Sequence, residues 1–364
     1  MKISPRLELL NPSLQRPDAL LSKARETDKF WLDKNENLDP YLAELFRKIL
    51  AEISISDFMT YPDTGDLYRK IAALISVRPD QLLLTPGSDG AIRLIFDAMI
   101  ERGDVVVHTD PTFAMYPVYA KIYGANTETI KYKRSSHAPY MDTEEVLQII
   151  RKSKPKLLCL PNPDSPTGTV ISPDLLKKIL TECENSGTLL LIDEAYHPFY
   201  NWSAISWCIS SENLVVARTF AKAWGAAGLR IGYLVAHPKT AALLHKIKPM
   251  YEVNTVAIDF ISRLIDCSSE MEGSVGRIKE AKKYFENEME ILGFGVSATE
   301  ANFIHVAFGN FEKPISNALK EKVYYRRSFD VECLEGFSRF TVGPRDIMEE
   351  VVSLIKRGMD ARAA

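Results

Sequence analysis

The sequence predicts an α/β protein: a mostly parallel sheet sandwiched by helices, joined to a smaller α+β domain. Between about residue 80 and residue 236, short apolar runs alternate with stretches of helical length. After about residue 250 the pattern changes to one long helical stretch, short strand candidates and a closing helix. Alternating strands and helices are typical of βαβ units and a parallel sheet. We therefore expect a large domain over residues 33–250, a small domain over 251–364, and an arm or further part of the small domain over 1–32.

Six strands are expected in the large domain, each buried on both faces. An apolar run of four to six residues between helices is the usual pattern of such a strand. One of the intervening helices begins after Ser172, which can cap it ahead of Pro173, and ends near Gly187. The expected strands are Gln81–Thr85, Asp104–His108, Lys156–Leu160, Thr188–Ile192, Leu214–Arg218 and Ile231–Ala236.

The small domain is expected to combine helices with a few short strands. A helical pattern runs from Glu270 to about Leu292, where Gly293 follows. Phe303–Ala307 and Arg339–Val342 are strand candidates, and a last helix begins near Arg345. Because strands and helices do not alternate here, an α+β arrangement is expected.

Composition and charge exclude several classes of protein. The 364 residues are 46% hydrophobic and 26% charged, which is typical of a globular chain. A net charge of −3, from 45 Lys and Arg against 48 Asp and Glu, argues against a nucleic-acid partner. No run approaches the ~18 apolar residues of a membrane helix, so no membrane partner is expected. The five cysteines and six histidines lack metal-binding spacing, so we expect no metal, and reduced thiols in the cytoplasm.

Two polar motifs follow predicted strands in the first half of the large domain. Gly87, Ser88 and Asp89 follow one strand and open a helix, where free N–H groups and the helix dipole favour a phosphate. An ordinary turn capped by Ser or Asp is the alternative interpretation. Asn162 follows a later strand, at the sheet edge where α/β proteins bind ligands. A Pro-rich connector is the alternative there.

Two further motifs follow the next strands. Asp193 ends an apolar strand, where a carboxylate needs a partner such as a protonated ring nitrogen. Tyr196 can donate to a nearby oxygen, and a helix N-cap is the alternative role of this motif. Lys222 lies in a Gly- and Ala-rich segment with Arg230 eight positions on. Partial burial and a neighbouring cation lower the pKa of a lysine, which suits a Schiff-base nucleophile. A surface lysine is the alternative.

The order of these motifs is more specific than any of them alone. Asp193 follows Asn162 by 31 positions, and Lys222 follows Asp193 by 29. In this order the chain resembles the fold-type I pyridoxal 5′-phosphate (PLP) enzymes, specifically the class I/II aminotransferases of the histidinol-phosphate aminotransferase-like group. The resemblance extends from Asp33–Asn37 to Phe340–Gly343. It implies a PLP-dependent transaminase that moves an amino group from an L-amino acid, such as glutamate, to a 2-oxo acid or oxo-phosphate acceptor.

The resemblance also implies a role for individual residues. Lys222 matches the Schiff-base lysine that shuttles the Cα proton, Asp193 the partner of the pyridine nitrogen, and Arg339 the clamp on the substrate α-carboxylate. Arg326 or Arg327 matches the arginine that binds the distal group of the substrate. The implied catalytic residues are Lys222, Asp193 and Tyr196; the cofactor-binding residues are these three with Gly87, Ser88, Asp89, Phe113, Asn162, Thr219, Arg230 and Tyr61; and the substrate-binding residues are Arg339, Arg326 and Asn37. Tyr61 matches a tyrosine that reaches across from the partner subunit, so a homodimer is expected.

The chain departs from the family pattern at a few positions. Ala221 stands where a phosphate-binding Ser is usual, and Asn162–Gly168 keeps the first Asn of its motif but not the second. The N-terminal Tyr-x-Pro-Gly element of authentic histidinol-phosphate aminotransferases is missing. The acceptor is therefore left open. A PLP-dependent phospho-amino-acid decarboxylase on the same scaffold is the alternative function, and a non-catalytic cofactor-binding regulator is a third.

Overall fold

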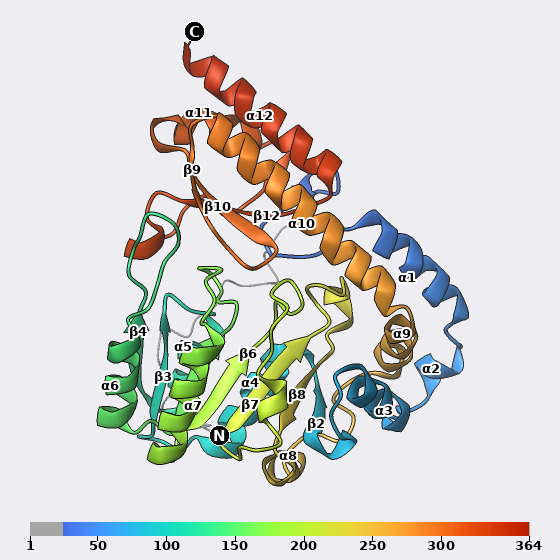
Figure 1. Ribbon diagram of the computed structural model, residues 1–364. Coiled ribbons are helices and arrows are strands. Elements are labelled where there is room, and N and C mark those ends of the chain that lie inside the picture. Colours follow the sequence, from blue (N-terminus) through green and yellow to red (C-terminus); the bar gives the residue numbers. More distant parts are fainter. Residues whose placement is uncertain (1–24, 364) are drawn as a thin grey trace, which may run out of the picture.

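The computed structural model describes residues 25–363 and forms an α/β unit with a smaller α+β region stacked on one end of it (Figure 1). Most of the predicted N-terminal arm, residues 1–24, lies outside the described residues. The first described element is a two-residue strand, β1 (Phe30–Trp31), which pairs in parallel with β11 (Val323–Tyr324). This pairing joins the beginning of the described chain to its C-terminal region.

A seven-stranded sheet forms the centre of the large unit, in the order β2-β8-β7-β6-β5-β3-β4. Strand β8 runs antiparallel to both of its neighbours, and the other pairs are parallel. All six predicted strands are present, with ends displaced by one or two residues. The strands are β2 (Leu82–Thr85), β3 (Val105–Asp110), β4 (Asn126–Lys131), β5 (Leu157–Pro161), β6 (Leu189–Asp193), β7 (Leu214–Thr219) and β8 (Gly232–Ala236).

Strand β4 is the one strand of this sheet that the sequence analysis did not predict. It carries Asn126, Thr127, Glu128 and Thr129, and its side chains are largely exposed. An edge strand with a polar sequence lacks the apolar run by which the buried strands were recognised. The omission therefore reflects its position at the edge rather than a different kind of fold.

Helices cover both faces of this sheet because successive side chains of a strand point to opposite sides. In β6, Leu190 and Ile192 join the core on one face, and Leu189 and Leu191 join the core on the other. All four are buried, and burying a leucine side chain contributes ~2 kcal/mol. The covering and flanking helices are α1 (Pro40–Glu52), α2 (Ser56–Met59), α3 (Gly65–Leu74), α4 (Gly87–Met99), α5 (Met115–Tyr123), α6 (Thr143–Ser153), α7 (Pro173–Ser186), α8 (Pro238–His245) and α9 (Thr255–Asp266).

Helix α7 shows that the predicted helix signals act as expected. Ser172 Oγ accepts a hydrogen bond from the backbone N–H of Leu175, and Pro173 occupies the first turn. Gly187 ends the helix in the left-handed conformation, with φ of 72°. The bounds of this helix are therefore encoded locally.

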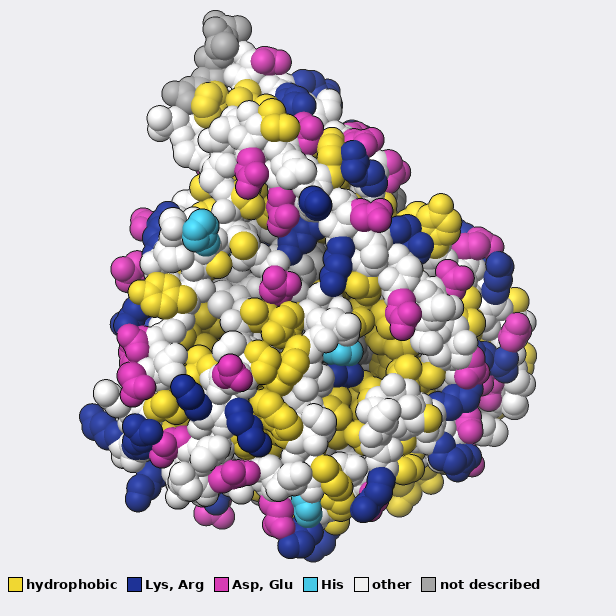
Figure 2. Space-filling model, viewed as in Figure 1, with side chains coloured by type: hydrophobic (Ala, Val, Ile, Leu, Met, Phe, Trp, Pro, Cys, Tyr) yellow, Lys and Arg dark blue, Asp and Glu magenta, His cyan; other side chains and the backbone are white. Residues whose placement is uncertain are grey.

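The C-terminal region is built on a three-stranded antiparallel sheet in the order β12-β10-β9. The predicted helix near residues 270–292, both strand candidates and the closing helix are all present. The elements are α10 (Ser268–Ile291), β9 (Gly295–Ser297), β10 (Phe303–Ala307), α11 (Glu312–Leu319), β12 (Ser338–Thr341) and α12 (Arg345–Ala363). Within residues 25–363, no helix has both the length and the apolar character needed to cross a bilayer. On the face shown in Figure 2, basic and acidic side chains are interspersed, in keeping with the near-neutral net charge.

Candidate active site

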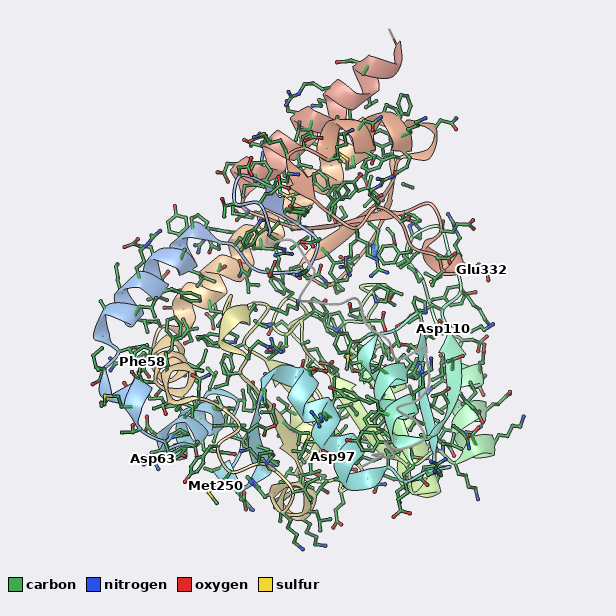
Figure 3. The ribbon with its side chains drawn as sticks, turned by 180° about the vertical axis from the view of Figure 1, so that it is seen from behind. Phe58, Asp63, Asp97, Asp110, Met250 and Glu332 are labelled. Carbon is green, nitrogen blue, oxygen red and sulfur yellow. The ribbon has the colours of Figure 1, made fainter. Side chains whose placement is uncertain are left out.

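A cavity of about 840 Å³ opens where the strand ends of the large sheet meet the C-terminal region. Figure 3 shows this junction from behind, with Asp110 at the end of β3 below Glu332 of the C-terminal region. Ten of the predicted site residues line the cavity: Ser88, Asp89, Phe113, Asp193, Tyr196, Thr219, Lys222, Arg230, Arg326 and Arg339. The structure thus brings together residues that are up to 251 positions apart in the sequence.

One end of the cavity lies at the start of helix α4. Gly232 on β8 lies directly against Gly87, where an added Cβ would be 2.5 Å from the Arg218 carbonyl oxygen and 2.7 Å from the Gly87 carbonyl carbon. Arg230 adopts a left-handed backbone, with φ of 52°, and its guanidinium lies over Gly87. Ser88, which carries a hydroxyl, is the second residue of the same helix. Free helix N–H groups and a guanidinium around one point favour a phosphate.

Lys222 lines the cavity and follows the end of strand β7 by three residues. Its ammonium donates to the backbone oxygen of Lys34 at 2.8 Å and lies 5.8 Å from the centre of the Tyr196 ring. Burial lowers the pKa of Lys222 to about 8, and the positive charges of Arg339 and Arg230 act in the same direction. A larger share of this amine is therefore unprotonated near neutral pH than for a surface lysine, as a nucleophile or base requires.

Asp193 is a buried carboxyl at the end of β6. Its Oδ1 accepts from the backbone N–H of Ala195 at 3.1 Å, and its Oδ2 accepts from the Tyr116 hydroxyl at 3.2 Å. Burial raises the pKa of Asp193 to about 7. Among residues 25–363 it forms no ion pair with a basic side chain, so a cationic ligand in the cavity would stabilise its ionised form.

Asn162 and Tyr196 supply polar groups on the strand ends next to Asp193. Asn162 Oδ1 accepts from the Ile171 N–H at 2.8 Å, while its Nδ2 is buried without a hydrogen-bond partner in the described structure. The Tyr196 hydroxyl accepts from Asn35 Nδ2 at 2.7 Å, and burial raises its pKa. A buried amide donor without a partner indicates a place for a ligand oxygen.

The opposite end of the cavity carries two arginines from the C-terminal region. Arg326 and Arg339 pair through their backbones, and both side chains line the cavity. The Arg326 guanidinium lies 4.3 Å from the Phe329 ring centre, and Arg339 lies 5.1 Å from that of Phe303. Arg339 donates to the Asp33 backbone oxygen at 2.9 Å. Within the described part of the chain neither arginine has a carboxylate partner, so both remain available to an anionic substrate.

Four of the predicted residues are not among those that line the cavity: Gly87, Asn162, Asn37 and Tyr61. Gly87 and Asn162 directly adjoin lining residues in the sequence, whereas the other two lie away from the cavity of their own chain. Asn37 Nδ2 donates to Ala223 O and Ser274 Oγ, both at 3.0 Å, which places it behind the cavity wall. Tyr61 is 78% exposed and stacks on Tyr251, with ring centres 4.3 Å apart. The structure therefore gives Asn37 a structural contact, and leaves Tyr61 on the outer surface of this chain.

The sequence analysis missed Asn35 and Phe329. Asn35 lines the cavity with φ of 58°, a conformation that asparagine tolerates better than most residues. It belongs to the same Asp33–Asn37 stretch as Asn37, so the motif pointed to the right segment but not to the right side chain. Phe329 lies in a loop, and nothing in its neighbours signals that it would meet Arg326.

Comparisons with known proteins agree on one family. The pattern described as "Aminotransferase class I and II" matches residues 27–355. A histidinol-phosphate aminotransferase of Thermoanaerobacter pseudethanolicus is 31% identical over 330 residues, covering 90% of this chain and 92% of that protein. The structure of a histidinol-phosphate aminotransferase from Sinorhizobium meliloti, in complex with PLP, superposes with a TM-score of 0.80 at 22% identity, covering 92% and 91% of the two chains. An L-threonine-O-3-phosphate decarboxylase from Porphyromonas gingivalis shares the fold, with a TM-score of 0.76 at 20% identity, covering 91% and 99%.

Proposed function

We propose that this chain, which belongs to the class I and II aminotransferase family, moves an amino group from an L-amino acid such as glutamate to an oxo substrate with a distal anionic group. That it is a PLP-dependent aminotransferase follows from the family pattern and from the similarity to the Thermoanaerobacter enzyme. The distal anion is our inference. The observation that carries it is the position of Arg326 beside Arg339, both without a carboxylate partner among the described residues, in the cavity that contains Lys222.

The residues of the cavity fit PLP. When bound, PLP supplies an electron-withdrawing ring that stabilises negative charge at the substrate Cα. The N–H groups of Gly87–Asp89, with Ser88, Thr219 and Arg230, would hold its phosphate. Asp193, a buried carboxyl without a cationic partner in the described chain, would hold its protonated ring nitrogen. The unpartnered Asn162 Nδ2 and the Tyr196 hydroxyl would bind its ring oxygen, and Phe113 would stack on the ring.

Lys222 is the proposed proton carrier. Its lowered pKa lets Nζ accept a proton from the substrate Cα and return it, which is the work of a general base and acid. Arg339 would orient the substrate by binding its α-carboxylate, with its guanidinium held by Asp33 O and Phe303. The cavity wall formed by Tyr196 and Phe329 would limit access of water to these groups.

Phosphate is the distal anion that we place first. The Thermoanaerobacter relative is named for histidinol phosphate, and an exposed guanidinium such as that of Arg326 suits phosphate and carboxylate alike. We therefore propose an oxo-phosphate acceptor, with a dicarboxylate-type oxo acid as the second choice.

The test compares two acceptors that differ only in a distal anion. In Arg326→Gln we expect the KM for the anionic acceptor to rise about tenfold, because a charged hydrogen bond is lost. The KM for the neutral acceptor should stay within about twofold. Arg327→Gln is the matched control, since Arg327 is adjacent but does not line the cavity. An equal loss on both acceptors would contradict the distal-anion proposal.

The decarboxylase alternative rests on fold alone, because the Porphyromonas structure is 20% identical. It predicts release of carbon dioxide from a phospho-amino acid without any oxo acceptor. We expect none above background in the same assay.

A homodimer is the proposed assembly. Apolar side chains of α2 and of residues 250–251 are exposed at one edge of the molecule, where Figure 3 labels Phe58, Asp63 and Met250. Thr255 Oγ1 donates to Thr60 O at 2.8 Å and ties the two segments together. An exposed apolar patch of this kind is typical of a protein interface. We call it the α2 patch; its residues are Ile55 (73% exposed), Phe58 (67%), Met59 (80%), Tyr61 (78%), Met250 (78%) and Tyr251 (51%).

Sedimentation of the full chain tests the assembly. Phe58→Asp should convert a dimer to a monomer, because a charge is placed on the buried face of the interface. Ile291→Asp is the control, since Ile291 is equally exposed, at 77%, and far from the α2 patch in the sequence. A wild-type monomer at micromolar concentration would overturn the proposal, and with it the role of Tyr61 at the partner's site.

Location and domain division complete the proposal. The five cysteines are unpaired, and four of them are buried, which suits a reducing compartment, so we propose a cytoplasmic location. We also propose that residues 33–250 act as the cofactor domain and 251–364 as a small domain that carries the two substrate arginines.

A further inference from the structure

A tyrosine lies between Asp193 and the helix that covers it. Tyr116, on α5, has no exposed surface, and its hydroxyl donates to Asp193 Oδ2 at 3.2 Å. Its ring meets Phe113 edge to face, with ring centres 5.8 Å apart. Because Phe113 lines the cavity and Tyr116 does not, Tyr116 approaches Asp193 from behind the site.

Asp193 depends on few donors. Within the described part of the chain its carboxylate accepts hydrogen bonds from Tyr116 and from the backbone N–H of Ala195. These occupy different oxygens, so each oxygen is fixed by one donor. The Ala195 backbone N–H holds Oδ1 and is present whatever the side chain at that position. Among the described residues Oδ2 is held by the Tyr116 hydroxyl, which a mutation can remove.

The charges around Asp193 make this donor important. Glu194 and Asp89 are acidic, and both raise the pKa of Asp193 on top of the larger effect of burial. The Cys159 thiol faces it from β5, and burial keeps the pKa of that thiol well above its usual value. Lys222 is the basic group that acts on it across the cavity. The hydrogen bonds from Tyr116 and Ala195 lower the pKa of Asp193 and so oppose burial and the neighbouring acids.

We propose that Tyr116 is a positioning residue for the reaction, which aims the Asp193 carboxylate at the ring nitrogen of PLP and keeps that carboxylate ionised. The inference rests on the proposed role of Asp193. The aromatic environment of Tyr116 suits the task, because a buried hydroxyl with one partner and a fully packed ring has no alternative position. Tyr116 does not contact the reacting atoms; it acts through Asp193.

The test uses the apoprotein reconstituted with PLP that carries ¹⁵N in its ring. In Tyr116→Phe we expect the ring-nitrogen resonance to move toward the unprotonated position, and the PLP dissociation constant to rise about tenfold. Tyr123→Phe is the matched control, because it removes a hydroxyl that donates to Asp97 from the same helix, outside the cavity. Its resonance and affinity should match the wild type. A wild-type resonance and affinity in Tyr116→Phe would overturn the proposal.

A second variant separates this inference from the proposed site. If Asp193→Asn leaves the ring nitrogen and PLP affinity unchanged, the role of Asp193 itself is wrong. If Asp193→Asn has a large effect and Tyr116→Phe has none, only the inference about Tyr116 fails. The double variant Tyr116→Phe/Asp193→Asn provides a test if Tyr116→Phe alone does not fold, because it also removes the buried charge that the hydroxyl stabilises. Compared with Asp193→Asn alone, the double variant should change PLP affinity less than twofold. A further tenfold loss would contradict the proposal.

Discussion

Two walls of the candidate active-site cavity are built in different ways. The strand-end cradle, formed by Asn162, Asp193, Thr219 and Lys222, follows three adjacent parallel strands, β5, β6 and β7. The arginine wall, formed by Arg326, Phe329 and Arg339, comes from β12 and the segment before it. In the cradle, sheet geometry alone brings residues together, because parallel strands end at one edge. In the wall, the packing of a second region decides what faces the cavity.

The difference extends to burial and charge. Asn162, Asp193 and Thr219 are at most 8% exposed, and one side-chain oxygen of each accepts a hydrogen bond from a backbone N–H. Arg326 is largely exposed, and its guanidinium rests on an aromatic ring. A buried, fixed cradle suits an unchanging cofactor, while an exposed wall can differ between substrates. We therefore expect mutations of the cradle to abolish the chemistry and mutations of the wall to change substrate preference.

The sharpest test of the cradle removes its amine. Lys222→Ala should lower kcat at least about 1,000-fold, because the proton carrier and nucleophile are lost together. Steady-state kinetics and the absorbance spectrum of the PLP-loaded protein would measure it. Lys279→Ala, which removes an exposed lysine on α10, should stay within twofold of the wild type. Substantial turnover by Lys222→Ala would refute the proposed role of this residue.

The second test adds a methyl group where β8 lies against the start of helix α4, next to the cradle. Gly232→Ala should destabilise the protein by about 2 kcal/mol and weaken PLP binding, because its Cβ would be 2.5 Å from the Arg218 oxygen and 2.7 Å from a Gly87 carbon. Chemical denaturation and PLP titration would measure the two effects. Gly228→Ala is the control, since nothing lies within 4 Å of an added Cβ there. Equal stability of both variants would show that the close approach is not required.

The smallest expected effect is a shift in the pH dependence of PLP uptake, and it tests whether the arginine wall acts on the cradle. A lysine must lose its proton to react with PLP, so uptake of PLP by the apoprotein should rise with pH, with a midpoint at about 8, and level off above it. Arg339 is one of the charges that lower the pKa of Lys222. Arg339→Gln should therefore move the midpoint to higher pH, which a stopped-flow pH series would detect. Arg327→Gln should leave it in place, and an unshifted midpoint in Arg339→Gln would mean that the wall does not act on the cradle.

The sequence was sufficient for most of the fold, because the relevant signals are local. Apolar runs gave the six buried strands, and the Ser172 cap with Gly187 gave helix α7. Strand β4 escaped because an edge strand needs no apolar run. The antiparallel direction of β8 was equally invisible, since a strand's own residues do not state the direction of its neighbours.

The residues of the candidate site can also be separated into those with a local sequence signal and those without one. By itself the sequence determined that Asn162, Asp193 and Lys222 lie at or just after the ends of successive strands, because their spacing follows the repeat of strand and helix. Their roles in catalysis remain a prediction from the resemblance. Only the tertiary structure decided that Asn35, not Asn37, faces the cavity, that Phe329 supports Arg326, and that Tyr116 supports Asp193 from behind. The physical reason is that these contacts join elements far apart in the chain. Their geometry depends on how helices and strands pack, and no local pattern of residues records it.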